Sequence, residues 1–230
     1  MTDSFDRARV GAICFDIDGT LADTDDAYVL RVARWLQPLA PFLPERDVSA
    51  AARRWVLRAE SPVNALLALL DHLHLDQILG AGLDHLHAMR GASAHSSIEL
   101  IPGARQALER LAEHYPLGVV TARERSSALE IIHAHDIQSF FKCVATARTT
   151  LRAKPHPAPV LWAADQLGFP ASEILMVGDT AVDIRAGNAA GAQTAALLCG
   201  FGERDELKSA GADVVLEGPL ELADLLLRSR

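Results

Sequence analysis

The chain has 230 residues and a formal net charge of −8 at neutral pH, with half of its residues hydrophobic and 23% charged. This length suffices for one large α/β domain, or for a core with a smaller inserted domain, and the composition is that of an ordinary globular protein. The acidic balance excludes broad nucleic-acid binding, because binding a polyanion requires a positively charged face.

The sequence has three cysteines, which are far apart and form no CxxC pair. This sparse, odd set predicts neither a disulfide framework nor a thiolate metal site, and it fits a reducing compartment. The N-terminal segment has no apolar signal region, and no run of about 18 apolar residues occurs, as a membrane-spanning helix would need. We therefore expect a cytoplasmic location and no membrane partner.

The first predicted strand, residues 10–15, is short and almost wholly apolar, which is typical of a strand buried on both faces of a sheet. It ends in polar and turn-forming residues. The long segment that follows lacks strand signals and has apolar residues at helical spacing, so residues 21–97 are predicted to form an all-helical insert. Helices are expected there at 25–36, 45–58, 62–73 and 84–90.

From residue 98 to the end of the chain, predicted strands and helices alternate. Helices are predicted at 104–114, 125–135, 158–167 and 182–190, with a last helix at the C-terminus. Strands are predicted at 117–120, 143–145, 174–177, 193–197 and 213–216. This alternation predicts an α/β fold with a doubly wound, Rossmann-like parallel sheet, formed by residues 1–20 and 98–230 and interrupted by the helical insert.

Three of the predicted strands are followed within two residues by a polar residue, namely Asp16, Thr121 and Asp179. In open α/β sheets, ligands bind outside the carboxyl ends of the strands. The three residues come from distant parts of the sequence, but a parallel sheet should bring them to one edge. The sequence therefore predicts a functional site at this edge.

The carboxylates of this edge come in two groups. Asp16 and Asp18 are separated by one residue, so both can project to the same side of an extended chain, and Gly19 permits a sharp turn close to a ligand. Asp179 is followed by Asp183 in the first turn of the next predicted helix, where a carboxylate also suits the positive helix end. Together the two groups predict a site of hard oxygen ligands, which Mg²⁺ prefers.

Thr121 and Lys154 are candidates for contacts to an anion. Residues 121–124 also fit a helix capping box that ends in Glu124, so the Thr121 hydroxyl has a purely structural alternative. Lysine occurs only at positions 142, 154 and 208. Lys154 precedes a predicted core helix, and its compact ammonium group is suited to neutralising a carboxylate and phosphoryl oxygens.

Four motifs, in this order and in this strand context, resemble those of the haloacid dehalogenase superfamily of phosphohydrolases. They are Asp16-x-Asp18-Gly19-Thr20, Thr121 after an apolar strand, Lys154-Pro155, and Gly178-Asp179-x-x-x-Asp183. The resemblance covers essentially the whole chain, and the insert resembles the helical (C1-type) cap of the phosphoglycolate phosphatase-like branch. It implies a Mg²⁺-dependent phosphatase that hydrolyses a small phosphate monoester through an aspartyl-phosphate intermediate.

The resemblance also implies a role for each matching residue. Asp16 would attack phosphorus, and Asp18 would protonate the leaving alcohol and then activate water. Thr121 and Lys154 would complete the catalytic set. The implied metal ligands are Asp16, Asp18 through its backbone carbonyl, Asp179, and Asp183 through water or from the outer shell. The implied substrate contacts are Gly19, Thr20, Ala122 and Arg123.

The residues of this chain argue to different degrees against the other activities found in this superfamily. Dehalogenases lack the aspartate at the position of Asp18, and phosphonatases use a cap lysine, whereas this insert has none. A phosphosugar mutase of the β-phosphoglucomutase type shares the cap and all four motifs, although its first motif usually ends in Gly-Val rather than Gly-Thr. A non-catalytic phosphate-binding protein would be expected to have lost a motif. The expected partner is a small phosphorylated metabolite, with phosphoglycolate, a sugar phosphate and a nucleotide monophosphate all open.

Overall fold

The structure is a computed structural model that describes residues 5–23 and 98–228. The chain divides into two units, one formed by Met1–Thr24 with Ile98–Arg230 and the other by Asp25–Ser97. The helices predicted within residues 21–97 lie outside the described residues, so the helical cap stays a prediction.

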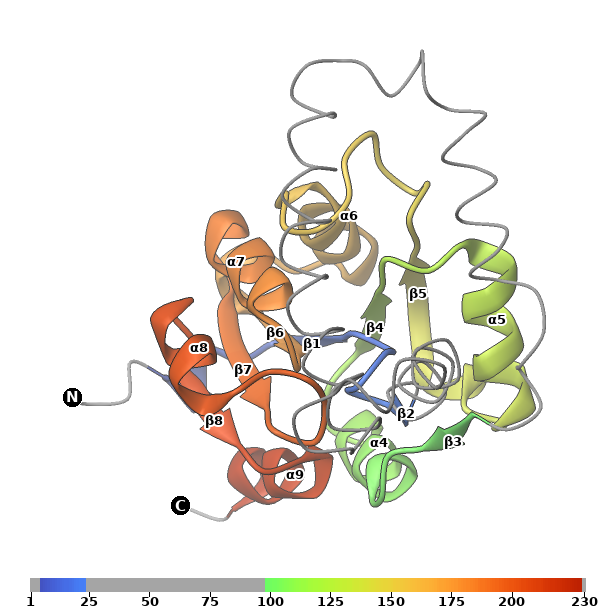
Figure 1. The fold of residues 1–230 in the computed structure, drawn as a ribbon, viewed down its shortest axis with the longest axis horizontal. Coiled ribbons are helices and arrows are strands. Elements are labelled where there is room, and N and C mark those ends of the chain that lie inside the picture. Colours follow the sequence, from blue (N-terminus) through green and yellow to red (C-terminus); the bar gives the residue numbers. More distant parts are fainter. Residues whose placement is uncertain (1–4, 24–97, 229–230) are drawn as a thin grey trace, which may run out of the picture. The chain divides into compact units, whose positions relative to one another are not determined.

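The first unit contains a six-stranded parallel sheet with the strand order β5-β4-β1-β6-β7-β8 (Figure 1). The strands are β1 (Ala12–Phe15), β4 (Leu117–Val120), β5 (Phe141–Ala145), β6 (Ile174–Gly178), β7 (Gln193–Leu197) and β8 (Val214–Leu216). The predicted α/β fold class is confirmed. Because β1 lies between β4 and β6, the residue that follows β1 is flanked by the ends of both neighbours.

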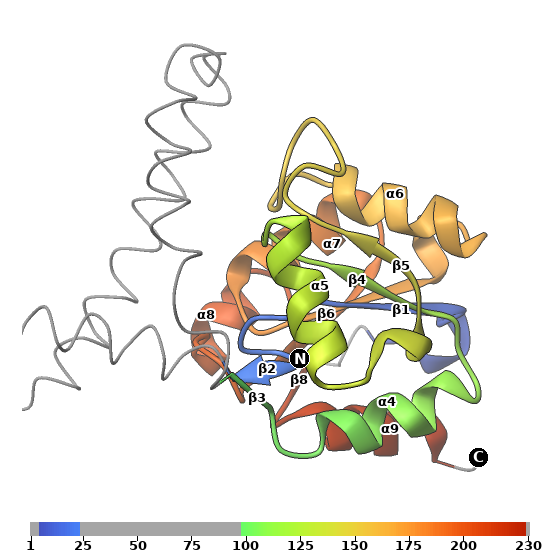
Figure 2. The same ribbon diagram turned by 90° about the vertical axis from the view of Figure 1, so that its right-hand side faces the viewer.

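Helices cover both faces of this sheet (Figure 2). They are α4 (Ala104–Ala112), α5 (Arg125–Ala134), α6 (Ala158–Leu167), α7 (Ala181–Ala190), α8 (Arg204–Ser209) and α9 (Pro219–Leu227). The layer of α6 and α7 lies on one face, and α4 and α9 lie together on the other. None of the described helices is long and apolar enough to cross a membrane.

Strand β1 is buried along its whole length, and its side chains alternate between two core clusters. Ile13 and Phe15 belong to the cluster that includes residues of α4, α5 and α9, whereas Ala12 and Cys14 belong to the cluster with α6 and α7. Burial on both faces explains why the strand reads as a continuous apolar run. The strand thus holds its carboxyl end firmly at the middle of the sheet.

Besides three short 3-10 helices, Arg7–Arg9, Gln138–Phe140 and Ala171–Glu173, the described part of this unit contains a two-stranded ribbon and a helix that were not predicted from the sequence. A two-stranded antiparallel ribbon, β2 (Ala22–Asp23) with β3 (Glu99–Leu100), joins the segments on either side of the insert, and its strands are too short to show an alternating pattern. Helix α8 is short and mostly polar with one buried side chain, Leu207, so it shows no amphipathic period. The bounds of the other strands and helices differ from the predicted ones by a few residues at most.

Candidate active site

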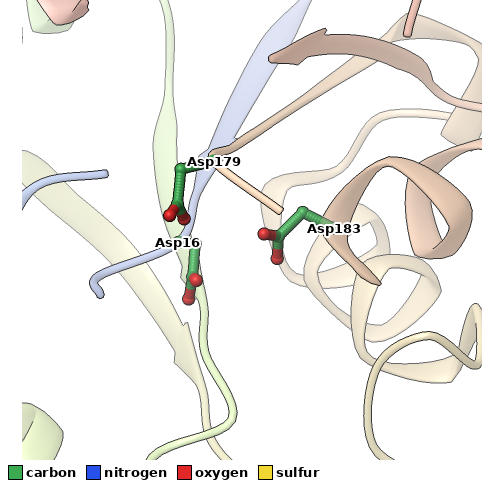
Figure 3. Close-up of side chains that lie close together, drawn as sticks. All are labelled: Asp16, Asp179 and Asp183. Atoms are coloured by element: carbon green, nitrogen blue, oxygen red, sulfur yellow. The ribbon is translucent and has the colours of Figure 1, made fainter. Parts of the chain in front are cut away.

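Three buried aspartates, Asp16, Asp179 and Asp183, face one another at the carboxyl edge of the sheet (Figure 3). One carboxylate oxygen from each lies within 4.8 Å of the others. Strand pairing explains this meeting, because Phe15 of β1 stands opposite Val177 of β6 and the chains then continue into the two aspartates. The Asp16 N–H also donates to the Val177 carbonyl at 2.9 Å, which extends the ladder by one residue.

Lys154 lies against this group of carboxylates. Its Nζ is 2.9 Å from Asp16 Oδ1 and 2.6 Å from Asp183 Oδ1, and it donates to the Val120 carbonyl at 2.8 Å. Only 3% of the side chain is exposed. Burial lowers the pKa of Lys154, but the charges of Asp16 and Asp183 raise it by more, so the net shift is upward and the ammonium stays protonated.

Burial raises the pKa of the Asp16 carboxyl, to about 7. The charge of Lys154 opposes this rise, whereas those of Asp183 and Asp18 add to it. Although Asp16 Oδ1 is at ion-pair distance from Lys154, the direction of approach is not that of a hydrogen bond, and within residues 5–23 and 98–228 this buried oxygen accepts none. The Lys154 ammonium offsets part of the cost of burying this oxygen, and a second cation would offset more of it.

The group of three aspartates therefore fits a divalent cation. Three carboxylates and one ammonium leave two negative charges in a buried space, and hard carboxylate oxygens are the ligands of Mg²⁺. The Asp18 carboxylate does not belong to this group. Of the four predicted metal ligands, the structure thus brings the side chains of three together.

Asp179 is fully buried and is held by two neighbouring segments. Thr20 Oγ1 donates to its Oδ1 at 3.2 Å, and the Phe201 N–H donates to its Oδ2 at 2.9 Å. Thr20 is itself fully buried, and its hydroxyl supports Asp179, while its predicted contact to substrate stays a prediction. The segment of residues 199–202 was not predicted to belong to the site, and its one sequence signal is a pair of glycines soon after a strand.

Gly200 and Gly19 leave the room that Asp179 occupies. A Cβ atom at Gly200 would lie 2.1 Å from Asp179 Oδ2, and one at Gly19, where φ is +67°, would lie 2.2 Å from the same oxygen. Such distances are far below van der Waals contact. The Asp179 carboxylate can therefore keep its position only if both residues are glycine.

We expect Gly200→Ala to weaken divalent-cation binding by about tenfold or more, because a second-shell change that displaces a ligand typically has an effect of this size. Isothermal titration of the metal-free protein with Mg²⁺ measures it. Gly218→Ala is the matched control, since the nearest atom to a Cβ there is 4.0 Å away. Equal Mg²⁺ affinities for the two variants would contradict the assignment of Asp179 as a metal ligand.

Asp183 has both of its oxygens engaged. Oδ1 accepts from Lys154, while Oδ2 accepts from the Thr180 N–H at 3.2 Å and from Thr180 Oγ1 at 2.7 Å, which completes a capping box at the start of α7. Asp183 therefore caps the start of α7, the structural alternative predicted for it, and its carboxylate also lies close to that of Asp16. The capping box fixes the carboxylate relative to the sheet edge.

The loop after β4 carries Thr121 and the predicted substrate contacts. Thr121 is buried, and its Oγ1 accepts a hydrogen bond from the Arg123 N–H at 3.2 Å. The alternative capping box at residues 121–124 is not formed, because α5 begins at Arg125 and its N-cap residue, Glu124, makes no side-chain capping bond. Ala122 is exposed. Arg123 reaches across to the Asp18 carboxylate, with Nε 2.8 Å from both oxygens.

Comparisons with known proteins agree with this arrangement. A family model described as haloacid dehalogenase-like hydrolase matches residues 13–197. An N-acetylmuramic acid 6-phosphate phosphatase from Pseudomonas aeruginosa is 31% identical, with 97% of each chain covered, and a phosphoglycolate phosphatase from Nitrosococcus oceani is 26% identical over 93% of this chain and 95% of its own. Among solved structures, a haloacid dehalogenase-like family hydrolase from Streptococcus pneumoniae has the same fold, with a TM-score of 0.70 at 23% identity over 95% of this chain and 99% of its own.

Proposed function

The chain belongs to the haloacid dehalogenase-like hydrolase family, and we propose that it is a Mg²⁺-dependent phosphatase with Asp16 as its nucleophile. The phosphatase class rests on the family match and on the relatives named as phosphatases. One observation supports the Mg²⁺ dependence and the role of Asp16 as the nucleophile. It is the buried group of Asp16, Asp179 and Asp183, with the Lys154 ammonium in contact with it.

In the proposed reaction, an Asp16 carboxylate oxygen forms a bond to phosphorus while the ester P–O bond breaks. The leaving oxygen takes a proton from Asp18, so that an alcohol departs instead of an alkoxide. Water then attacks the phosphorus of the aspartyl-phosphate and gives a proton to Asp18, while the bond between phosphorus and the Asp16 oxygen breaks, which frees the carboxylate and releases inorganic phosphate. Asp16 is suited to the first step because the strand ladder fixes its backbone and because the Lys154 ammonium lies 2.9 Å from its Oδ1.

The remaining predicted residues act on the transferring group. The Thr121 hydroxyl binds a phosphoryl oxygen, and the Lys154 ammonium offsets the charge that Asp16 and the phosphoryl group bring together. When bound by Asp16, Asp179, the Asp18 backbone carbonyl and, indirectly, Asp183, Mg²⁺ supplies the positive charge that neutralises the phosphoryl oxygens.

The proposed substrate is a small phosphate monoester. The two relatives described above are named as phosphatases of phosphate monoesters. A substrate of this class has an alcohol leaving group, which agrees with the proposed role of Asp18 as the proton donor. Gly19, Thr20, Ala122 and Arg123 stay as proposed substrate contacts. The predicted helical cap of residues 21–97 is proposed to select the leaving group. The cytoplasmic location also stays a prediction.

We expect the purified protein to release phosphate from p-nitrophenyl phosphate and from a panel of phosphorylated metabolites. Chelation by EDTA should abolish the release, because two negative charges would remain uncompensated where the phosphate has to bind, and added Mg²⁺ should restore it. The phosphate released is measured with and without each addition. Activity that is indifferent to EDTA would remove the metal from the proposal, and inactivity with every ester would remove the phosphatase.

A further inference from the structure

The contact between Arg123 and Asp18 is a strong interaction at this edge to which the proposed mechanism assigns no role. Arg123 Nε lies 2.8 Å from both oxygens of Asp18, and Arg123 Nη2 lies 2.5 Å from Oδ1. The two residues are 105 positions apart in the sequence. A two-pronged contact of this kind fixes the direction of a carboxylate as well as its place.

Arg123 is itself held from three directions, which gives the contact its rigidity. Its Nη1 donates to Ser127 Oγ at 2.8 Å, its backbone N–H donates to Thr121 Oγ1, and its carbonyl accepts from the Ala147 N–H at 2.9 Å. Its side chain is 20% exposed, against 33% for Asp18. The guanidinium is thus a fixed support, whereas the Asp18 carboxylate lies at the rim, where a ligand has access to it.

We propose that Arg123 is the positioning residue of Asp18, holding its carboxylate beside Asp16 in the orientation from which it exchanges a proton with the leaving group. The inference rests on the proposed phosphatase function and adds to it a residue that acts through Asp18. A substrate contact alone explains less, because the guanidinium already has partners for Nε, Nη1 and Nη2 within the protein.

Leaving groups of different basicity separate a positioning role from a structural one. A p-nitrophenolate departs without a proton, whereas the phenolate of phenyl phosphate and the alkoxide of an alkyl phosphate depend on the acid. We expect Arg123→Gln to lower kcat/KM for phenyl and alkyl phosphates by about 10²-fold and for p-nitrophenyl phosphate by only about threefold. Arg123→Lys should recover little, because an ammonium lacks the planar fork.

Two further variants make the test specific. Ser127→Ala, which removes one anchor of the guanidinium, should cause a smaller loss with the same dependence on leaving group. Asp18→Asn combined with Arg123→Gln should be no worse than Asp18→Asn alone, since residues that act through one another are not additive. Arg148→Gln is the control, because that arginine pairs with Glu124 and is 70% exposed.

Equal losses for all esters, no loss, or additive losses in the double variant would overturn the positioning role. These outcomes are distinct from failure of the phosphatase itself, in which the unmodified protein would release no phosphate from any ester. Melting temperatures of all variants identify any that are lost through misfolding, and in that case the milder Ser127→Ala variant still decides the question through its dependence on leaving group.

Discussion

Asp16→Asn abolishes phosphate release, by about 10⁴-fold or more, if Asp16 is the nucleophile. The amide has nearly the same shape as the carboxylate but is a very poor nucleophile, and it cannot form the aspartyl-phosphate. Folding should be retained, because Lys154 keeps its partner Asp183 and because a buried charge whose burial is unfavourable has been removed. Initial rates with p-nitrophenyl phosphate and intact mass after acid quenching measure turnover and phosphoryl-enzyme together.

Asp165→Asn is the matched control for this change, since Asp165 is exposed on helix α6. A beryllium fluoride complex provides an independent readout, and in a crystal structure it should be attached to the Asp16 carboxylate. Density on Asp18 would exchange the proposed roles of the two residues. Substantial activity in Asp16→Asn would place the nucleophile elsewhere.

The meeting of Asp16, Asp179 and Asp183 was predictable because it depends on topology and residue type alone. Apolar runs that end in aspartate identify buried parallel strands, and such strands end at one edge of a sheet. The structure adds the register, with Phe15 opposite Val177, which sets the two strand ends side by side. Hydrophobic pattern thus fixes which residues meet, and strand register fixes how closely.

The support that residues 199–202 give to Asp179 was not predictable, because it comes from a backbone N–H and from the absence of a side chain. Phe201 donates through its main chain, and Gly200 contributes only the absence of a side chain. Neither property shows in a search for reactive side chains. A signal existed in the two glycines of residues 199–202, but it acquires a meaning only once the loop after β7 is known to pass over the Asp179 carboxylate.

The loop after β4 shows a different limit of sequence reasoning. Residues 121–124 have the pattern of a capping box, yet the Thr121 N–H still pairs with the Ala145 carbonyl at 2.9 Å as a continuation of the sheet. Helix α5 begins at Arg125, as the predicted helix 125–135 does, and the Arg123 side chain contacts the Asp18 carboxylate. The capping-box pattern of residues 121–124 therefore did not predict the structure of this loop. The contact that Arg123 makes instead is with a residue 105 positions away, and no short segment of the sequence contains both residues.

Lys154→Met should lower kcat by about 10²- to 10³-fold, the usual effect of removing a preorganised group that stabilises charge. It should also lower the free energy of unfolding of the metal-free protein by about 3–5 kcal/mol, since Asp16 and Asp183 would lose their buried partner. Phosphate release and chemical denaturation measure the two effects. Lys142→Met is the control, because Lys142 is exposed on β5.

The pH dependence of Mg²⁺ binding tests the electrostatic part of the same argument. With the pKa of Asp16 raised from 3.8 to about 7, the folded metal-free protein keeps a proton that the unfolded chain has released between these values. Its stability therefore falls as pH rises through this range, and Mg²⁺ has to displace a proton below pH 7. Mg²⁺ affinity should accordingly weaken as pH drops below this value.

Removing Lys154 should move that transition to higher pH, because the charge of Lys154 opposes the rise of the Asp16 pKa. Isothermal titrations with Mg²⁺ across the neutral range, on the unmodified protein and on Lys154→Met, locate the midpoint in each. A midpoint that does not move would mean that Lys154 leaves the ionisation of Asp16 unchanged. A shift to higher pH would mean that one buried ammonium lowers the pKa of the nucleophile and so favours the ionised form that binds the metal.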